Sequence, residues 1–157
     1  MIFFRLICAA CLTSVISWIL NGPHGAFLAK ETHEMMWVGP ICAAFVGYLI
    51  LAPRQGMGIV NGVLNGFWTG ILTVILSGFV YLVIRCADPV IHGLVNDFRA
   101  FVRIVYYEAK PLFDSLKDLK LLGLTVGMTT ALGLATELLQ WGLVRMRSDE
   151  EDEPYMG

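Results

Sequence analysis

Charged side chains are almost absent from four long stretches of this 157-residue chain. None lies between Arg5 and Lys30, between Glu34 and Arg54, or between Arg54 and Arg85, and Glu137 is the only one from 121 to 144. A helix needs about 17–25 apolar residues to cross a bilayer. The sequence therefore predicts an all-α, polytopic membrane protein. We expect a four-helix transmembrane bundle with spans at about 2–20, 35–52, 57–84 and 121–144.

Two other interpretations of the first span are less consistent with the sequence. A cleaved signal peptide would end at a small-x-small site, which the following "NGPHGAFLAK" does not offer. A lipoprotein signal would need a longer apolar stretch before Cys11. We expect the first span to be retained in one transmembrane domain, residues 1–147, followed by an acidic disordered tail, residues 148–157.

Residues 88–119 differ from the rest, because apolar and charged residues alternate there with helical spacing. Asp88-Pro89 is a typical helix start, and Lys110-Pro111 interrupts the pattern. We expect an amphipathic helix that lies in the membrane interface between the third and fourth spans. A helix packed on a partner subunit would have the same pattern. The apolar positions are Ile91, Leu94, Val95, Phe98, Phe101, Val102 and Val105.

Small and polar residues recur every four positions along the third span. Asn-Gly pairs often mark hairpin turns, but a period of four has meaning only on a helix. Small residues at this spacing let two helices approach closely in lipid. The pattern predicts a tightly packed bundle, and a homo-oligomer or contact with other membrane subunits. The predicted packing positions are Gly58, Gly62, Gly66 and Gly70, the adjacent Asn61 and Asn65, and Gly123 and Gly127 of the fourth span.

Glu137 is the one ionisable residue well inside a predicted span. An uncompensated charge there costs about 3 kcal/mol or more, so its carboxylate needs a partner. It is a candidate proton-coupling group, or it has a structural role in which it pairs with Asn61 or Asn65. Arg54, together with the helix ends beside it, is a candidate anion contact because helix N-termini attract negative charge.

The chain carries no catalytic signature such as a nucleotide loop or a nucleophile elbow. Cys8 and Cys11 are close in sequence, but without a second ligand pair they fit helix packing better than redox chemistry. His24 and His33 do not match a strong metal-ligand spacing. The net charge of −2 does not favour nucleic acid. We expect a non-enzymatic protein without cofactor or metal, whose first partner is the lipid bilayer.

The run "LAPRQGMGIVNGVLNGFWTG" and the last span ending "LATELLQWGLVRMR" give the chain a family resemblance. Over about residues 36–147 it resembles the TrgA family of small bacterial integral membrane proteins, described as tellurite-resistance-related. The matching positions are Pro53-Arg54, the glycines at 56 and 58, Asn65-Gly66, and Glu137 with Trp141. In the family the acid and the Trp lie closer together, so this last match is loose.

The resemblance implies a bacterial inner-membrane protein with a role in tellurite or oxyanion resistance. Such a protein could act as a small transporter or permease component, or as a non-catalytic accessory subunit of a larger membrane complex. The positive-inside rule favours both termini in the cytoplasm, because Arg5, Arg54, Arg145 and Arg147 then lie inside.

Overall fold

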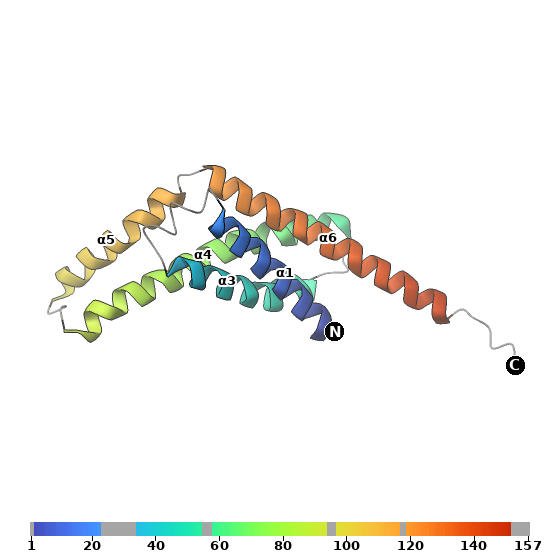
Figure 1. The fold of residues 1–157 in the computed structure, drawn as a ribbon, viewed down its shortest axis with the longest axis horizontal. Coiled ribbons are helices and arrows are strands. Elements are labelled where there is room, and N and C mark those ends of the chain that lie inside the picture. The colour runs from blue at the N-terminus through green and yellow to red at the C-terminus, as the bar shows by residue number, and fades with distance from the viewer. Residues whose placement is uncertain (1, 23–33, 55–57, 94–96, 117–118, 152–157) are drawn as a thin grey trace, which may run out of the picture.

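A computed structural model describes residues 2–22, 34–54, 58–93, 97–116 and 119–151, which fold into helices with no strand among them. The predicted all-α class is therefore confirmed. In chain order (Figure 1) the elements are α1 (Ile2–Asn21), α3 (Met35–Val46), the π-helical η1 (Gly47–Leu51), the 3₁₀-helical η2 (Ala52–Arg54), α4 (Ile59–Ile91), α5 (Phe98–Leu116) and α6 (Leu119–Glu151).

Three helices of the described residues are long and apolar enough to cross a membrane. They are α1, α4 and the Leu119–Arg145 part of α6, while Met35–Leu51 forms a shorter apolar helix. Large apolar side chains also point away from the bundle: Ile41, Phe45 and Phe79 are each more than 60% exposed, at 67%, 62% and 64%. A bilayer solvates such side chains, whereas water would not. The structure thus supports a membrane protein.

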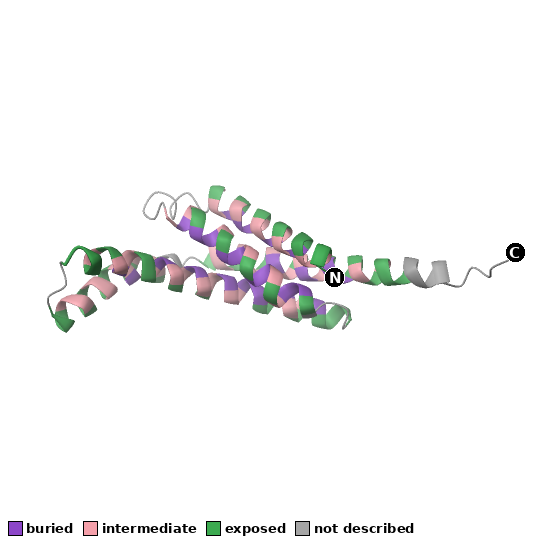
Figure 2. Cartoon of the chain, turned by 90° about the horizontal axis from the view of Figure 1, so that it is seen from below, coloured by how far each residue is buried: buried purple, intermediate pink, exposed green. Residues whose placement is uncertain are grey.

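The helices form one bundle with a projecting hairpin. α4 packs on α6, α1 on α3, and α3 on α4, while α5 folds back beside the last part of α4 (Figure 1). Buried residues lie on the sides of the helices that face one another, and exposed residues cover the outer sides (Figure 2). The main buried cluster joins α1 and α3 and comprises Leu12, Ile16, Ile19, Ala43 and Val46.

The backbones of α4 and α6 approach each other closely. A Cβ atom added to Gly66 would lie 2.5 Å from the Thr129 carbonyl oxygen and 3.0 Å from the Gly133 Cα. One added to Gly62 would lie 2.8 Å from the Glu137 Cβ, and one added to Gly70 would overlap Thr129. Only glycine leaves room for this contact.

The facing glycine on α6 is Gly133, which sequence reasoning did not single out. A Cβ atom there would lie 2.7 Å from the Gly66 Cα and would also collide with the Gly62 carbonyl oxygen. Gly123 and Gly127, predicted as packing positions, are exposed, and a Cβ atom added to either would meet nothing within 4 Å in the described part of the chain. Their helix face is free of neighbours from these residues.

Asp88-Pro89 does not begin a new helix, contrary to the expectation for residues 88–119. α4 runs through Pro89 to Ile91, since a proline near a helix end removes only one backbone hydrogen bond. The stop comes at Gly93, whose φ of 67° is the left-handed conformation common just after a helix. The next helix therefore starts later, with α5 at Phe98.

Two further helix ends differ from the sequence-based boundaries. α5 continues through Pro111 to Leu116, so Lys110-Pro111 does not end it. α6 continues to Glu151, and its helix includes residues 148–151 of the segment expected to be a disordered tail. Residues 152–157 lie outside the described part of the chain.

Replacing Gly66 with alanine should weaken the α4–α6 contact. The new methyl group would collide with backbone atoms that cannot rotate away, and overpacking of this kind costs about 1–3 kcal/mol. Gly78→Ala is the matched control on the same helix, because its Cβ atom would meet nothing within 4 Å. There, alanine should instead stabilise the helix by up to about 1 kcal/mol. Unfolding in detergent, followed by helical circular dichroism, measures both. Equal stability of the two variants would contradict the close contact.

Candidate functional site

Glu137 of α6 lies at the beginning of α4. Its side chain is 4% exposed, and its Oε1 accepts a hydrogen bond of 2.7 Å from the backbone N–H of Gly58. Gly58 is the residue before the first turn of α4 and has a φ of 103°, a conformation that side-chain-bearing residues rarely adopt. Glycine at this position is what allows the chain to present its N–H to the carboxylate.

The negative carboxylate of Glu137 lies where the start of α4 carries partial positive charge. The first backbone N–H groups of a helix lack partners within the helix and carry a partial positive charge. No side chain caps the start of α4 from within its own segment. The carboxylate from α6 satisfies the Gly58 donor instead, and the missing side chain of Gly62 leaves room for it. Glu137 thus acts as a capping residue supplied by a neighbouring helix.

The two asparagines predicted as alternatives lie on the same part of α4. Asn61 is exposed and Asn65 is half-buried, and both take part in polar interactions. Asn61, Asn65, Thr69 and Thr73 follow one another every four residues and form a polar stripe on α4. Thr69 and Thr73 are buried, and the Thr73 hydroxyl donates to the Thr69 carbonyl oxygen at 2.8 Å. The polar stripe therefore faces the bundle from its middle onward.

Arg54, the candidate anion contact, ends η2, and the structure describes only its backbone. It precedes the start of α4 by four residues. An anion drawn to this helix end would find the Glu137 carboxylate already there. The arrangement is therefore less suited to binding an oxyanion than the sequence alone indicates.

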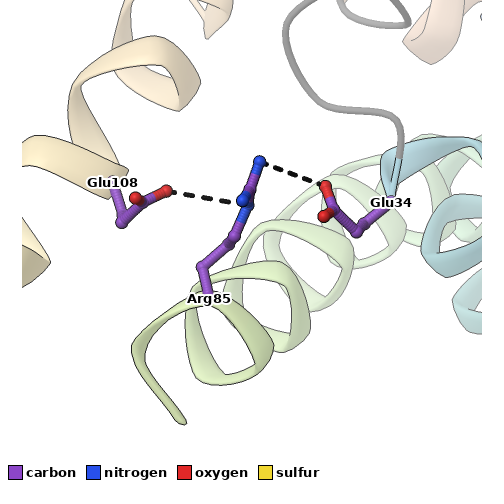
Figure 3. Close-up of polar contacts among 3 residues, drawn as sticks. All are labelled: Glu34, Arg85 and Glu108. Atoms are coloured by element: carbon purple, nitrogen blue, oxygen red, sulfur yellow. Dashed lines mark ion pairs between the residues drawn. The ribbon is translucent and has the colours of Figure 1, made fainter. Parts of the chain in front are cut away.

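A second polar cluster, not anticipated from the sequence, lies at the opposite end of the bundle (Figure 3). Arg85 of α4 forms ion pairs with Glu34, which precedes α3, at 3.3 Å, and with Glu108 of α5, at 3.7 Å. Its guanidinium group also lies 5.8 Å from the centre of the buried Tyr81 ring. This Arg85 cluster (Glu34, Arg85 and Glu108) ties three helices together.

One signal in the sequence could have indicated the Arg85 cluster. Glu34 and Arg85 are the charged residues that border two of the charge-free stretches. Spans that run in opposite directions bring such border residues to the same membrane face. The contact of Glu108 with Arg85 could not be predicted from these borders, because it depends on how α5 folds back on α4.

The cysteines and histidines were also candidates for thiol or metal chemistry. The four cysteines are free; Cys8, Cys42 and Cys86 are buried, and Cys11 is half-buried. Cys8 lies in a small cluster with Leu51 and Ala52, so it fills a packing position between α1 and η1. Among the described residues, no three His, Cys, Asp or Glu side chains lie close enough to share a metal ion. His24 and His33 lie outside the described residues.

No protein-family model, curated protein or solved structure matches this chain.

Replacing Glu137 should destabilise the fold, and more so when the new side chain cannot accept the hydrogen bond from Gly58. Glu137→Ala removes the acceptor of the Gly58 N–H, and loss of a hydrogen bond to a charged group costs about 1.5–3 kcal/mol. Glu137→Gln keeps an acceptor oxygen of nearly the same shape, so it should lose only part of that stability. The free energy of unfolding in detergent measures both. If Glu137→Ala is as stable as the parent, then the cap does not stabilise the bundle.

Proposed function

We propose that this chain is a four-span bacterial inner-membrane protein that supports tellurite tolerance as a non-catalytic accessory subunit of a larger membrane complex. Three spans correspond to the three long apolar helices. The fourth is Met35–Leu51, made of the 12 residues of α3 and the 5 of η1. At 1.5 Å per residue these reach about 26 Å, close to a hydrocarbon core of about 30 Å, and local thinning of the bilayer can cover the difference.

The observation that carries the accessory role is the position of the Glu137 carboxylate at the start of α4. A permease for tellurite would need a site that attracts an oxyanion, and helix N-termini are common anion sites. Here the chain fills that site with its own carboxylate, 2.7 Å from the Gly58 nitrogen. A second anion would have to displace Glu137 and overcome its repulsion. Glu137 is better suited to hold α4 against α6 than to bind a substrate.

The proposed link with tellurite is supported by the resemblance of residues 36–147 to the TrgA family. This link concerns the biological role of the chain and does not include a reaction with tellurite. Neither the Cys8 nor the Cys42 thiol is placed to act on an oxyanion, because both side chains are buried, at 0% and 5% exposed. Tolerance would therefore depend on what this subunit assembles with.

We place α5 in the membrane interface as part of the same proposal. Its apolar side chains at Phe98, Val102, Tyr106 and Phe113 are at least half exposed, at 75%, 50%, 69% and 62%, and they recur at helical spacing. An amphipathic helix buries such a face at the boundary between head groups and acyl chains.

The small transporter is the second candidate, and one observation favours it. A carboxylate that is 96% buried in a membrane span is a typical proton-coupling group, and Glu137 fits that description with its 4% exposure. The two candidates make opposite predictions for a variant that keeps the cap but cannot be charged.

Deletion of the gene should make the host strain more sensitive to tellurite, and the intact chain should restore tolerance. Glu137→Gln should restore tolerance as well as the parent does, because an accessory subunit needs the fold and not the charge. Growth on graded tellurite, with membrane levels of each variant checked by immunoblot, measures this. A Glu137→Gln variant present at parental levels but unable to restore tolerance would support proton coupling. A deletion strain as tolerant as its parent would refute the tellurite role.

Mild detergent extraction should recover the chain together with other membrane proteins. An accessory subunit keeps its partners. On native gels it should therefore migrate at a mass larger than that of the 17.4 kDa chain alone, and denaturing gels of the same band should show additional chains. A discrete homo-oligomer with no other chain would favour the transporter instead.

A further inference from the structure

An apolar cavity of about 380 Å³ opens between the helices at the end of the bundle that holds the Arg85 cluster. Every long helix and α3 contribute to its wall, with Ile16 of α1, Met35 of α3, Leu82 of α4, Leu112 of α5 and Leu121 of α6 among the lining residues. Its volume lies in the range of sites that bind small organic molecules, about 300–1,000 Å³.

The three hydroxyl-bearing residues in the wall do not make the cavity polar. The Thr73 hydroxyl donates to the Thr69 carbonyl oxygen at 2.8 Å, and the Thr125 hydroxyl to the Leu121 carbonyl oxygen at 2.8 Å. Ser77 is buried at 7% exposure. Because these threonine hydroxyls bond to their own helix, they have little need of a polar ligand. The cavity therefore suits an aliphatic chain.

The three residues of the Arg85 cluster do not line the cavity, but each lies close along its helix to a residue that does. Leu82 precedes Arg85 by three residues on α4, and Leu112 follows Glu108 by four on α5, so each leucine shares a helix face with its charged neighbour. Met35 directly follows Glu34. A molecule with its chain in the cavity would thus place its polar end beside Glu34, Arg85 and Glu108 (Figure 3).

This end of the cavity lies at the expected depth of lipid head groups. Arg85 is the first charged residue after the long apolar stretch of α4. Trp18, in the last turn of α1, and Trp37, in the first turn of α3, are 61% and 70% exposed at the same end. Exposed tryptophans are enriched at the membrane–water interface.

The cluster retains hydrogen-bonding capacity of both kinds. Glu34 Oε2, an acceptor, and Arg85 Nε, a donor, are buried atoms that make no hydrogen bond among the described residues, although both belong to the ion pairs, Oε2 with Arg85 Nη2 and Nε with Glu108 Oε2. The ion-pair distances of 3.3 and 3.7 Å are longer than the 2.7–2.9 Å typical of charge-assisted hydrogen bonds. A ligand that offers a donor and an acceptor together would satisfy both atoms.

From this we infer that the cavity and the Arg85 cluster bind a zwitterionic phospholipid with a primary ammonium head group. One acyl chain fills the cavity, the ammonium donates to Glu34 and Glu108, and the phosphate accepts from Arg85. A phosphocholine head group carries the same charges but has no N–H donor. A phosphoglycerol head group lacks the cation, and its negative charge would face two carboxylates. The inference rests on the membrane location proposed above but not on the role in tellurite tolerance.

The test titrates the full-length protein, purified in mild detergent, with three lipids that share their acyl chains. Native mass spectrometry measures the affinity for the phosphoethanolamine, phosphocholine and phosphoglycerol forms. The phosphoethanolamine lipid should bind about tenfold more tightly than either of the others, as expected from one charge-assisted hydrogen bond. Equal binding of the three lipids, preference for the anionic lipid or no binding would overturn the inference.

Variants locate the binding to the cluster. Glu34→Gln and Glu108→Gln should each reduce the preference for the phosphoethanolamine lipid. Asp88→Asn is the matched control, because it removes the same charge from an exposed carboxylate on α4 outside the cluster; it should bind like the parent. A preference that survives both glutamine substitutions would place the lipid elsewhere. A chain that stays in solution without detergent would instead refute the membrane location itself.

Discussion

The close contact between α4 and α6 determines where the buried carboxylate of Glu137 lies. In lipid, helices gain little from burying apolar side chains against each other, so association depends on packing and hydrogen bonds. Gly62, Gly66 and Gly133 let the two backbones touch. This contact brings Glu137 within 2.7 Å of the Gly58 nitrogen. A bulkier residue at Gly62 would push the carboxylate away from the helix end that it caps.

Positive charge at each end of the apolar part of α4 is balanced by carboxylates, but the two arrangements differ. At the start, partial positive charge on unpaired N–H groups is balanced by one buried carboxylate, Glu137. Near the other end, the full charge of Arg85 is shared between two carboxylates whose side chains are about a third to two-fifths exposed. The first end is closed by the chain itself. The second stays partly exposed beside an apolar cavity, so a ligand can reach it.

Sequence reasoning predicted the elements better than their contacts. The all-helical class followed from charge-free stretches, because a buried or lipid-facing backbone must satisfy its hydrogen bonds internally. The glycine period on α4 identified its helical conformation. On α6, spacing alone could not distinguish the stripe of Gly123 and Gly127 from Gly133, since which face meets α4 depends on the rotation of the helix. The Asp88-Pro89 and Lys110-Pro111 pairs were wrong as helix boundaries, because α4 and α5 run through their prolines and a proline near a helix end removes only one backbone hydrogen bond.

At the candidate site, too, the sequence identified a residue but not its contacts. Glu137 stood out in the sequence because it is a lone acid among apolar residues, but one of its partners is a backbone N–H 79 positions away, which no side-chain pattern reveals. Arg54 was predicted as an anion contact on the assumption that the start of α4 is free to bind one. Once Glu137 occupies that helix end, the same acid that suggested proton coupling becomes an argument against an oxyanion site. The acidic surplus of the Arg85 cluster points the same way, because it favours a ligand with a cationic group over an anion.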